Sequence, residues 1–189
     1  MTDNITDKIP TQAKCEELMA KYSMLPNIVL HSRQVMRVSI AITDNLKDGL
    51  SINRDIVIAA ALLHDITKTR SLKTKERHAA SGGALLRELG FGRVAGIVEQ
   101  HVILRNLNLE GRLEEVEIVY YADKRVMHDK IVTIEDRVHD LIKRYATTEE
   151  IRDQILKNKA TALAVERKIA GFMKMDIRDA LDKIQQFHF

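Results

Sequence analysis

Residues 53–65 read NRDIVIAAALLHD and contain the longest purely apolar run of the chain. Asn53 is a preferred N-cap residue, so a helix is predicted to begin there. Residues 56–63 are apolar on every side of that helix, which is typical of a central helix buried by its neighbours. The pair His64-Asp65 at its end is therefore expected to lie in the interior. Because an unpaired buried carboxylate is costly, Asp65 requires a partner there.

The rest of the chain follows a helical period, and no stretch alternates apolar and polar residues long enough to propose a strand. Eight glycines and two prolines among 189 residues leave few tight turns, which argues against a sandwich or a barrel. The prediction is a single all-α domain over residues 1–189, with a core at about 26–125 and a C-terminal helical extension at about 133–189. Further helices are predicted at about 11–23, 26–49, 78–89, 91–103 and 113–125, then from 133, from a capping box at Thr147 and Glu150, and from Asp176.

Charge and cysteine content limit the compartment and the partners. The formal net charge is only +3, and the basic residues near the His-Asp pair have no interleaved aromatic residues, which disfavours a nucleic-acid role. Cys15 is the only cysteine, which excludes an internal disulfide and suits a reducing compartment. The longest apolar run, residues 56–63, is far shorter than the ~20 residues that span a bilayer. With a polar N-terminus that carries no hydrophobic signal segment, a cytoplasmic protein without membrane contact is expected.

Five predicted helices each direct a histidine or an aspartate at the same core. Residues three and four apart share a helix face. By this test, four further side chains lie on apolar faces: His31, His78, His101 and Asp123. The two other His-Asp pairs differ, because residues 128–129 lie in a polar connection and residues 139–140 on the flank of an amphipathic helix. One such histidine is more often a hydrogen-bonded core residue than a ligand, but six inward imidazoles and carboxylates together indicate a divalent metal such as Mn, Fe, Co, Ni or Zn.

A basic segment joins two of these candidate ligands. Five cations and one acid lie between Asp65 and His78, and both ends of the segment are tethered beside the expected site. Positive charge in that place favours an anionic substrate. The cations are Lys68, Arg70, Lys73, Lys75 and Arg77. Of these, residues 73, 75 and 77 taken singly are typical of a solvated loop.

Three more cations are candidates for contact with an anionic substrate. Arg105 is four residues after His101 and shares its predicted helix face, one turn nearer the loop. Lys124 and Arg125 stand beside Asp123. A lysine there acts as a point charge, whereas an arginine can bind two oxygens at once. Simple surface charge explains these three residues equally well.

The ordered set of six candidate ligands resembles the HD-domain superfamily of metal-dependent phosphohydrolases. The motifs that carry the resemblance are residues 31–35 (HSRQV), 62–68 (LLHDITK) and 119–124 (VYYADK), within about 26–125. The chain departs from the His-Asp-Ile-Gly form of the motif, since Thr67 replaces the glycine. It also has Val102 after His101, where the cyclic-dinucleotide phosphodiesterases have a second histidine. That departure disfavours a cyclic-dinucleotide substrate.

The resemblance implies a compact HD-domain helical bundle with two divalent metals per chain. One metal would be held by His31, His64, Asp65 and Asp123, and the other by His78 and His101, with Asp65 bridging. Asp65 would orient the attacking water and Lys68 would bind the phosphate. The implied activity is hydrolysis of a phosphate ester of a nucleotide or another small phosphorylated metabolite by metal-activated water.

Two alternatives to hydrolysis stay open. One is a dinuclear-iron oxygenase of the same fold, and the other is a metal-containing nucleotide sensor without turnover. The reaction type among phosphomonoesterase, phosphodiesterase and pyrophosphohydrolase is also open. The alanine-rich helix around 160–169 either packs on the metal-binding core or forms the seam of a homodimer.

Overall fold

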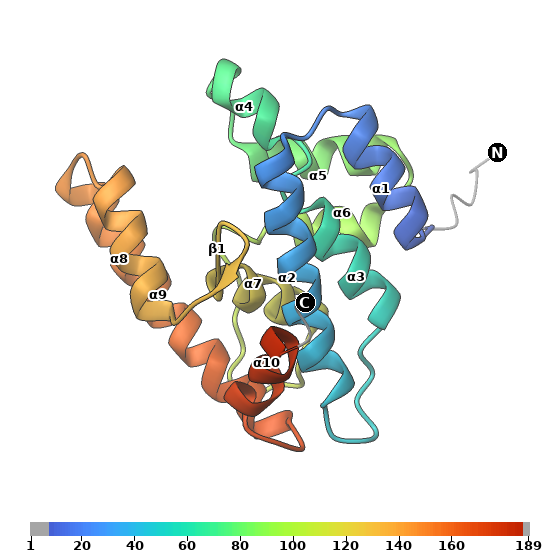
Figure 1. The fold of residues 1–189 in the computed structure, drawn as a ribbon, viewed down its shortest axis with the longest axis vertical. Helices are drawn as coiled ribbons and strands as arrows, with labels where there is room; N and C mark the ends of the chain where they lie inside the picture. Colours follow the sequence, from blue (N-terminus) through green and yellow to red (C-terminus); the bar gives the residue numbers. More distant parts are fainter. Residues whose placement is uncertain (1–7, 187–189) are drawn as a thin grey trace.

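The computed structural model describes residues 8–186 and confirms an all-α fold (Figure 1). The central helix α3 (Arg54–Leu63) begins at Asn53, whose side chain accepts a hydrogen bond from the backbone N–H of Ile56 at 3.1 Å. All residues from Ile56 to Leu63 are buried, as expected for a helix that is apolar on every side. The helices packed around it are α1 (Gln12–Lys21), α2 (Pro26–Asp44), α6 (Gly92–Val98) and α7 (Glu115–Lys124).

Two further helices lie between α3 and α6 in the sequence. Helix α4 (Lys68–Thr74) follows directly after the His-Asp pair, and α5 (His78–Glu88) packs against both α4 and α6. A hairpin of two short antiparallel strands, β1 (Val126–Met127) and β2 (Lys130–Ile131), then follows α7. In its register Val126 pairs with Ile131.

The C-terminal helices first extend away from the bundle as an arm and then pack against it again. Helix α8 (Ile134–Tyr145) and the first half of α9 (Glu149–Phe172) run side by side and extend away from the bundle (Figure 1). The second half of α9 approaches α7, and α10 (Ile177–Gln186) packs against α2. Among the described residues, none of the helices combines the length and the apolar character needed to cross a bilayer.

Several predicted boundaries are wrong. The basic segment, expected as a loop, contains α4 because it carries no helix breaker between Thr67 and Lys75. The helix predicted to reach residue 103 ends at Val98, so His101 lies in the turn beyond it. The helix that starts at Pro26 ends at Asp44, before residue 49. The hairpin was not predicted, because strands of two residues show no alternating pattern.

The helix starts were predicted more accurately than the ends. Thr148, not Thr147, caps α9, and its hydroxyl accepts from the backbone N–H of Ile151 at 3.3 Å. Asp176 precedes α10 and accepts from the backbone N–H of Arg178 at 2.7 Å, as expected for a capping carboxylate.

Candidate metal centre

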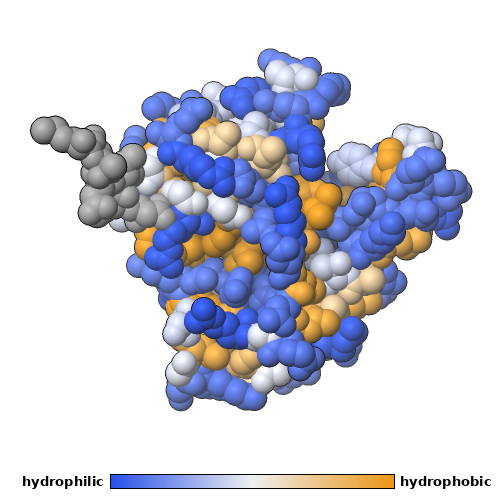
Figure 2. Space-filling view, turned by 180° about the vertical axis from the view of Figure 1, so that it is seen from behind, coloured by the Kyte–Doolittle hydropathy of each residue, from blue (hydrophilic) through white to orange (hydrophobic). Residues whose placement is uncertain are grey.

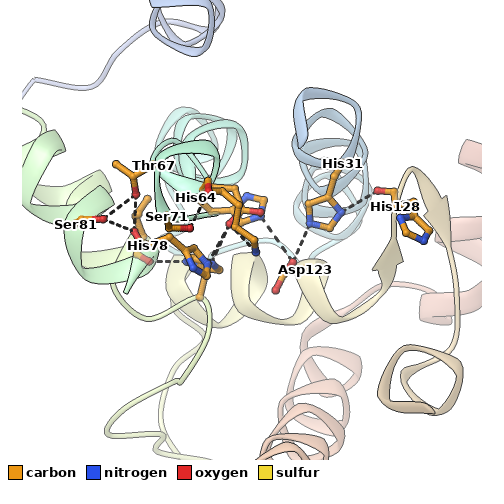
Figure 3. Close-up of polar contacts among 12 residues, drawn as sticks. His31, His64, Thr67, Ser71, His78, Ser81, Asp123 and His128 are labelled. Atoms are coloured by element: carbon orange, nitrogen blue, oxygen red, sulfur yellow. Dashed lines mark hydrogen bonds and ion pairs between the residues drawn. The ribbon is translucent and has the colours of Figure 1, made fainter. Parts of the chain in front are cut away.

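Five segments of the bundle bring the six predicted residues to one place. His31 comes from α2, the pair His64-Asp65 from the end of α3, and His78 from the start of α5. His101 lies just past α6, and Asp123 is in the last turn of α7. Figure 3 shows several of these side chains converging between the helices. Five of the six residues line a cavity of about 430 Å³, and His64 lies fully buried behind them.

Backbone carbonyl groups orient three of the four imidazoles. In each case Nδ1 donates its proton to a main-chain oxygen, so that Nε2 presents its lone pair to the cluster. Such outer hydrogen bonds fix the tautomer and ring direction of metal-binding histidines. The pairs are His31 with the carbonyl of His128 (2.9 Å), His64 with that of Ala61 (2.8 Å) and His101 with that of Val98 (2.7 Å).

The first group of converging atoms lies around His64. Its Nε2 is buried and has no hydrogen-bond partner, and it is 3.6 Å from Oδ2 of Asp65 and 3.7 Å from Oδ1 of Asp123. Nε2 of His31 is 3.0 Å from the same Asp123 oxygen. Ligand atoms of His31, His64 and Asp65 lie within 4.8 Å of one another. A buried nitrogen without a proton donor, beside two carboxylates, is the arrangement that a cation satisfies.

The second group shares Asp65 with the first. Oδ1 of Asp65 is 3.2 Å from Nε2 of His78 and 3.5 Å from Nε2 of His101. The two imidazole nitrogens are themselves 3.2 Å apart. Asp65 therefore faces two sets of nitrogen donors at once, one on each side of its carboxylate.

The electrostatics of the cluster suit a divalent cation. Burial lowers the pKa of His64 to about 3, so its imidazole is neutral at pH 7. Burial also lowers the pKa of His78, against the opposing effect of its contact with Asp65. For Asp65 and Asp123 burial alone would raise the pKa, but Lys68 beside the first and Lys124 beside the second, with the nearby imidazoles, lower it well below the usual range. Neutral imidazoles with ionised carboxylates are the ligands that first-row divalent metals bind.

Two contacts that support the cluster were not predicted from the sequence. The carbonyl that holds His31 belongs to His128, whose φ of +58° is rare for a residue with a side chain. The hydroxyl of Thr67 donates to the carbonyl of His78 at 2.8 Å and accepts from the hydroxyl of Ser81 at 3.0 Å (Figure 3). The departure from the His-Asp-Ile-Gly motif was the one available signal for Thr67. A backbone carbonyl leaves no signal in the side-chain pattern.

Two of the four predicted phosphate-binding cations line the cavity. Nζ of Lys68 is 3.4 Å from Oδ1 of Asp65, and the side chain is one-third exposed. Nζ of Lys124 is 2.7 Å from Oδ2 of Asp123 and 2.7 Å from the carbonyl oxygen of His101.

The structure does not bring Arg105 and Arg125 to this cavity. Arg105 is exposed and borders a separate pocket, because α6 ends before the turn that would align it with His101. Arg125 faces away from the cluster, donates to the carbonyl of Val132 at 2.7 Å and contacts the Tyr121 hydroxyl and Glu166. These bonds fasten the hairpin and α9 to the end of α7.

Two of the proteins that are similar to this chain match it at 26% identity. A tRNA (cytidine(56)-2'-O)-methyltransferase of Thermoplasma volcanium is 26% identical over 181 residues, which are 95% of this chain and 46% of that protein. An uncharacterized protein of Methanocaldococcus jannaschii is 26% identical over 132 residues, which are 62% of this chain and 77% of that protein. The chain thus spans about half the length of the first relative.

A known protein family matches the part of the chain that contains all six candidate metal ligands. Residues 28–127 match the HD domain, a segment that includes all six clustered residues and more than half of the chain. No solved structure matches the chain significantly. With the family match and the geometry of its His and Asp residues, this chain belongs to the HD-domain family.

Proposed function

We propose that this protein is a metal-dependent phosphohydrolase that cleaves a phosphate ester of a nucleotide or another small phosphorylated metabolite. The observation that carries the proposal is the shared position of Asp65 between two sets of imidazole nitrogens. Two lysines stand at the same end of the cavity. Donor groups for two cations, next to fixed positive charge, form a site for an anionic ester.

In this proposal the two donor sets hold two divalent metals. The first set comprises His31, His64, Asp65 and Asp123, and the second comprises His78, His101 and Asp65. When bound, such a metal pair lowers the pKa of water and neutralises charge on phosphoryl oxygens. The ligand types suit Mn, Fe, Co, Ni or Zn.

The remaining chemistry falls to the chain's own side chains. Asp65 lies between both donor sets, where its ionised carboxylate orients the attacking water. Lys68 keeps that carboxylate ionised and, with its ammonium group partly exposed in the cavity, contacts a phosphate oxygen. Four cations line the cavity, and each is paired with a carboxylate: Lys68 with Asp65, Lys124 with Asp123, Arg137 with Asp140 and Lys159 with Glu135. Excess positive charge for an anionic ester would therefore come from the metals when bound.

The name of the Thermoplasma relative supports a different reaction for that protein. This chain matches 46% of it, so we do not extend methyl transfer to this chain. An oxygenase would use the same donor atoms but needs no phosphate-binding cation. Lys68, which is partly exposed in the cavity beside Asp65, favours a phosphorylated ligand and therefore hydrolysis.

Phosphate release from a panel of esters tests the proposal. The chain is purified without chelator, supplied separately with Mn, Fe, Co, Ni or Zn, and compared with a His64→Ala/Asp65→Ala double variant. A matched control replaces the exposed residues His139 and Asp153 with Ala. We expect metal-dependent release that only the first variant loses. No release with any metal, or equal release by the first variant, would contradict the proposal.

The same samples separate hydrolysis from the two alternatives. Oxygen consumption by the iron-loaded chain without phosphate release would indicate an oxygenase. Thermal stabilisation by a nucleotide that is recovered chemically unchanged would indicate a sensor. Either result replaces the hydrolase proposal.

A further inference from the structure

The cavity that contains the metal-ligand candidates has a second half with a different chemical character. Opposite the imidazoles and aspartates, its wall is built from the arm of α8 and α9. The apolar residues in this wall are Ile134, Val138, Leu141, Tyr145, Ile151, Ile155 and Ala162. Three polar side chains of the same arm, Arg137, Asn158 and Lys159, also line the cavity, and Arg137 and Lys159 are paired with Asp140 and Glu135. The HD-domain match ends at residue 127, so this wall lies outside the family segment. We call it the apolar wall.

Apolar side chains are exposed at the edge of this cavity. Leu72 of α4, Tyr145 of α8 and Ile151 of α9 are 53%, 51% and 39% exposed, and all three line the cavity. Figure 2 shows hydrophobic side chains where the α8–α9 arm meets the bundle. Clustered exposed apolar residues beside polar groups mark a binding surface more often than scattered ones do.

The packing of α8 leaves its apolar stripe partly uncovered. Ile134 and Val138, near the bundle, are buried, whereas Tyr145 at the far end is exposed. The stripe therefore continues beyond the part that the protein's own core covers. Its outer portion contributes to the cavity and has little role in the core.

We propose that the apolar wall binds the organic part of the substrate, and that the substrate is a phosphorylated compound with an apolar or aromatic group. The inference rests on the proposed function only in placing the phosphate at the His/Asp end. A bare phosphate has no organic part to contact these apolar side chains, and the hydroxyl groups of a polyol placed against them would lose their hydrogen bonds to water. The volume of about 430 Å³ falls within the range of small-ligand pockets.

Binding of alkylphosphonates tests this inference without turnover, because their P–C bond is not an ester. The affinities of methyl-, propyl-, pentyl- and phenylphosphonate for the full chain with Mn added are measured by calorimetry. We expect each methylene to tighten binding about two- to fourfold until the cavity is filled. Phenylphosphonate is expected to bind at least tenfold more tightly than methylphosphonate. An affinity that does not change with the length of the alkyl group, or no binding of any phosphonate, would overturn the inference.

Variants locate the effect in the apolar wall. Leu141→Asn and Ile155→Asn each change one lining residue, and we expect both to reduce the gain per methylene. Leu156→Asn is the matched control, since Leu156 is an exposed leucine of the same helix that does not line the cavity. An equal gain in all four proteins would overturn the inference. The wild-type series remains decisive even where a variant does not fold.

The outcome can be separated from that of the proposed function. A chain that hydrolyses no ester but binds longer phosphonates more tightly would refute hydrolysis and support the apolar wall. A chain that hydrolyses esters with no preference for apolar groups would do the opposite. A dimer in sedimentation that Tyr145→Ser dissociates, together with flat phosphonate affinities, would assign the wall to an interface between copies and overturn the inference.

Discussion

The buried imidazole of His64 makes a quantitative prediction about stability and pH. Its side chain is 0% exposed, and burial lowers its pKa to about 3, whereas a histidine in the unfolded chain titrates near 6.5. Between these two pKa values His64 is protonated in the unfolded chain and neutral in the folded chain. The contribution of His64 is therefore fully present above pH 6.5 and is lost as the pH falls toward 3.

The size of this effect follows from the two pKa values. Between pH 7.5 and pH 5.0, linkage gives a loss of about 2 kcal/mol in the free energy of unfolding from His64 alone. His78, whose pKa is also lowered, changes stability in the same direction. Asp65 and Asp123 stay ionised in the folded chain over this range, and their lowered pKa values act at more acid pH.

Urea unfolding with chelator present, at pH 7.5 and pH 5.0, measures the loss. His64→Asn is expected to remove about 2 kcal/mol of the pH dependence, and its amide can still donate to the carbonyl of Ala61. His139→Asn, at an exposed position, is the control and should keep the wild-type dependence. An equal pH dependence in His64→Asn and wild type would refute the argument. An NMR titration of the wild-type His64 ring gives a second test, since a proton gained between pH 7.5 and 5.0 would also refute it.

Three further substitutions give distinct expected results. Thr67→Val removes the donor to the carbonyl of His78, so urea unfolding should show a loss of about 1–3 kcal/mol; a loss below 0.5 kcal/mol would contradict this. Lys168→Met leaves Glu117 buried without its cation, 2.7 Å away in the folded chain, and should cost about 3–5 kcal/mol by the same assay; unchanged stability would show that the pair is not needed. Lys68→Met should retain the bound metal, measured by mass spectrometry, and lower kcat/KM for the preferred ester about ten- to a hundredfold; unchanged kcat/KM would exclude a phosphate contact.

The convergence of the candidate ligands could be predicted wherever a regular helix carries the side chain. His31 and Asp123 share faces with apolar residues, and helical geometry alone directs them inward. Asp65 follows the one helix that is apolar all round, so its burial was predictable as well.

Side chains beyond an early helix end lie elsewhere than helical periodicity predicts. His101 reaches the cluster from a turn beyond α6, so its inward position was predicted for the wrong reason. Arg105 was assigned to the site on the same assumed helix and lies outside the cavity. Helix ends depend on local capping and tertiary contacts that a periodic pattern does not contain.

Other parts of the site depend on contacts distant in sequence. The carbonyl of His128 meets His31 across 97 positions, and its role depends on the backbone of a hairpin turn. The placement of α8 and α9 opposite the cluster depends on how the arm leaves the bundle. The sequence pattern identified α8 as amphipathic but gave no direction for its apolar face.

Asp65 is proposed to serve two donor sets, one containing His31 and the other containing His101, and the number of divalent metal ions bound per chain tests this claim. Mass spectrometry of the purified chain, supplied with Mn and washed, should count two ions in wild type, one in either His31→Asn or His101→Asn, and none in Asp65→Asn. No ion in wild type, or two ions retained in Asp65→Asn, would contradict the claim.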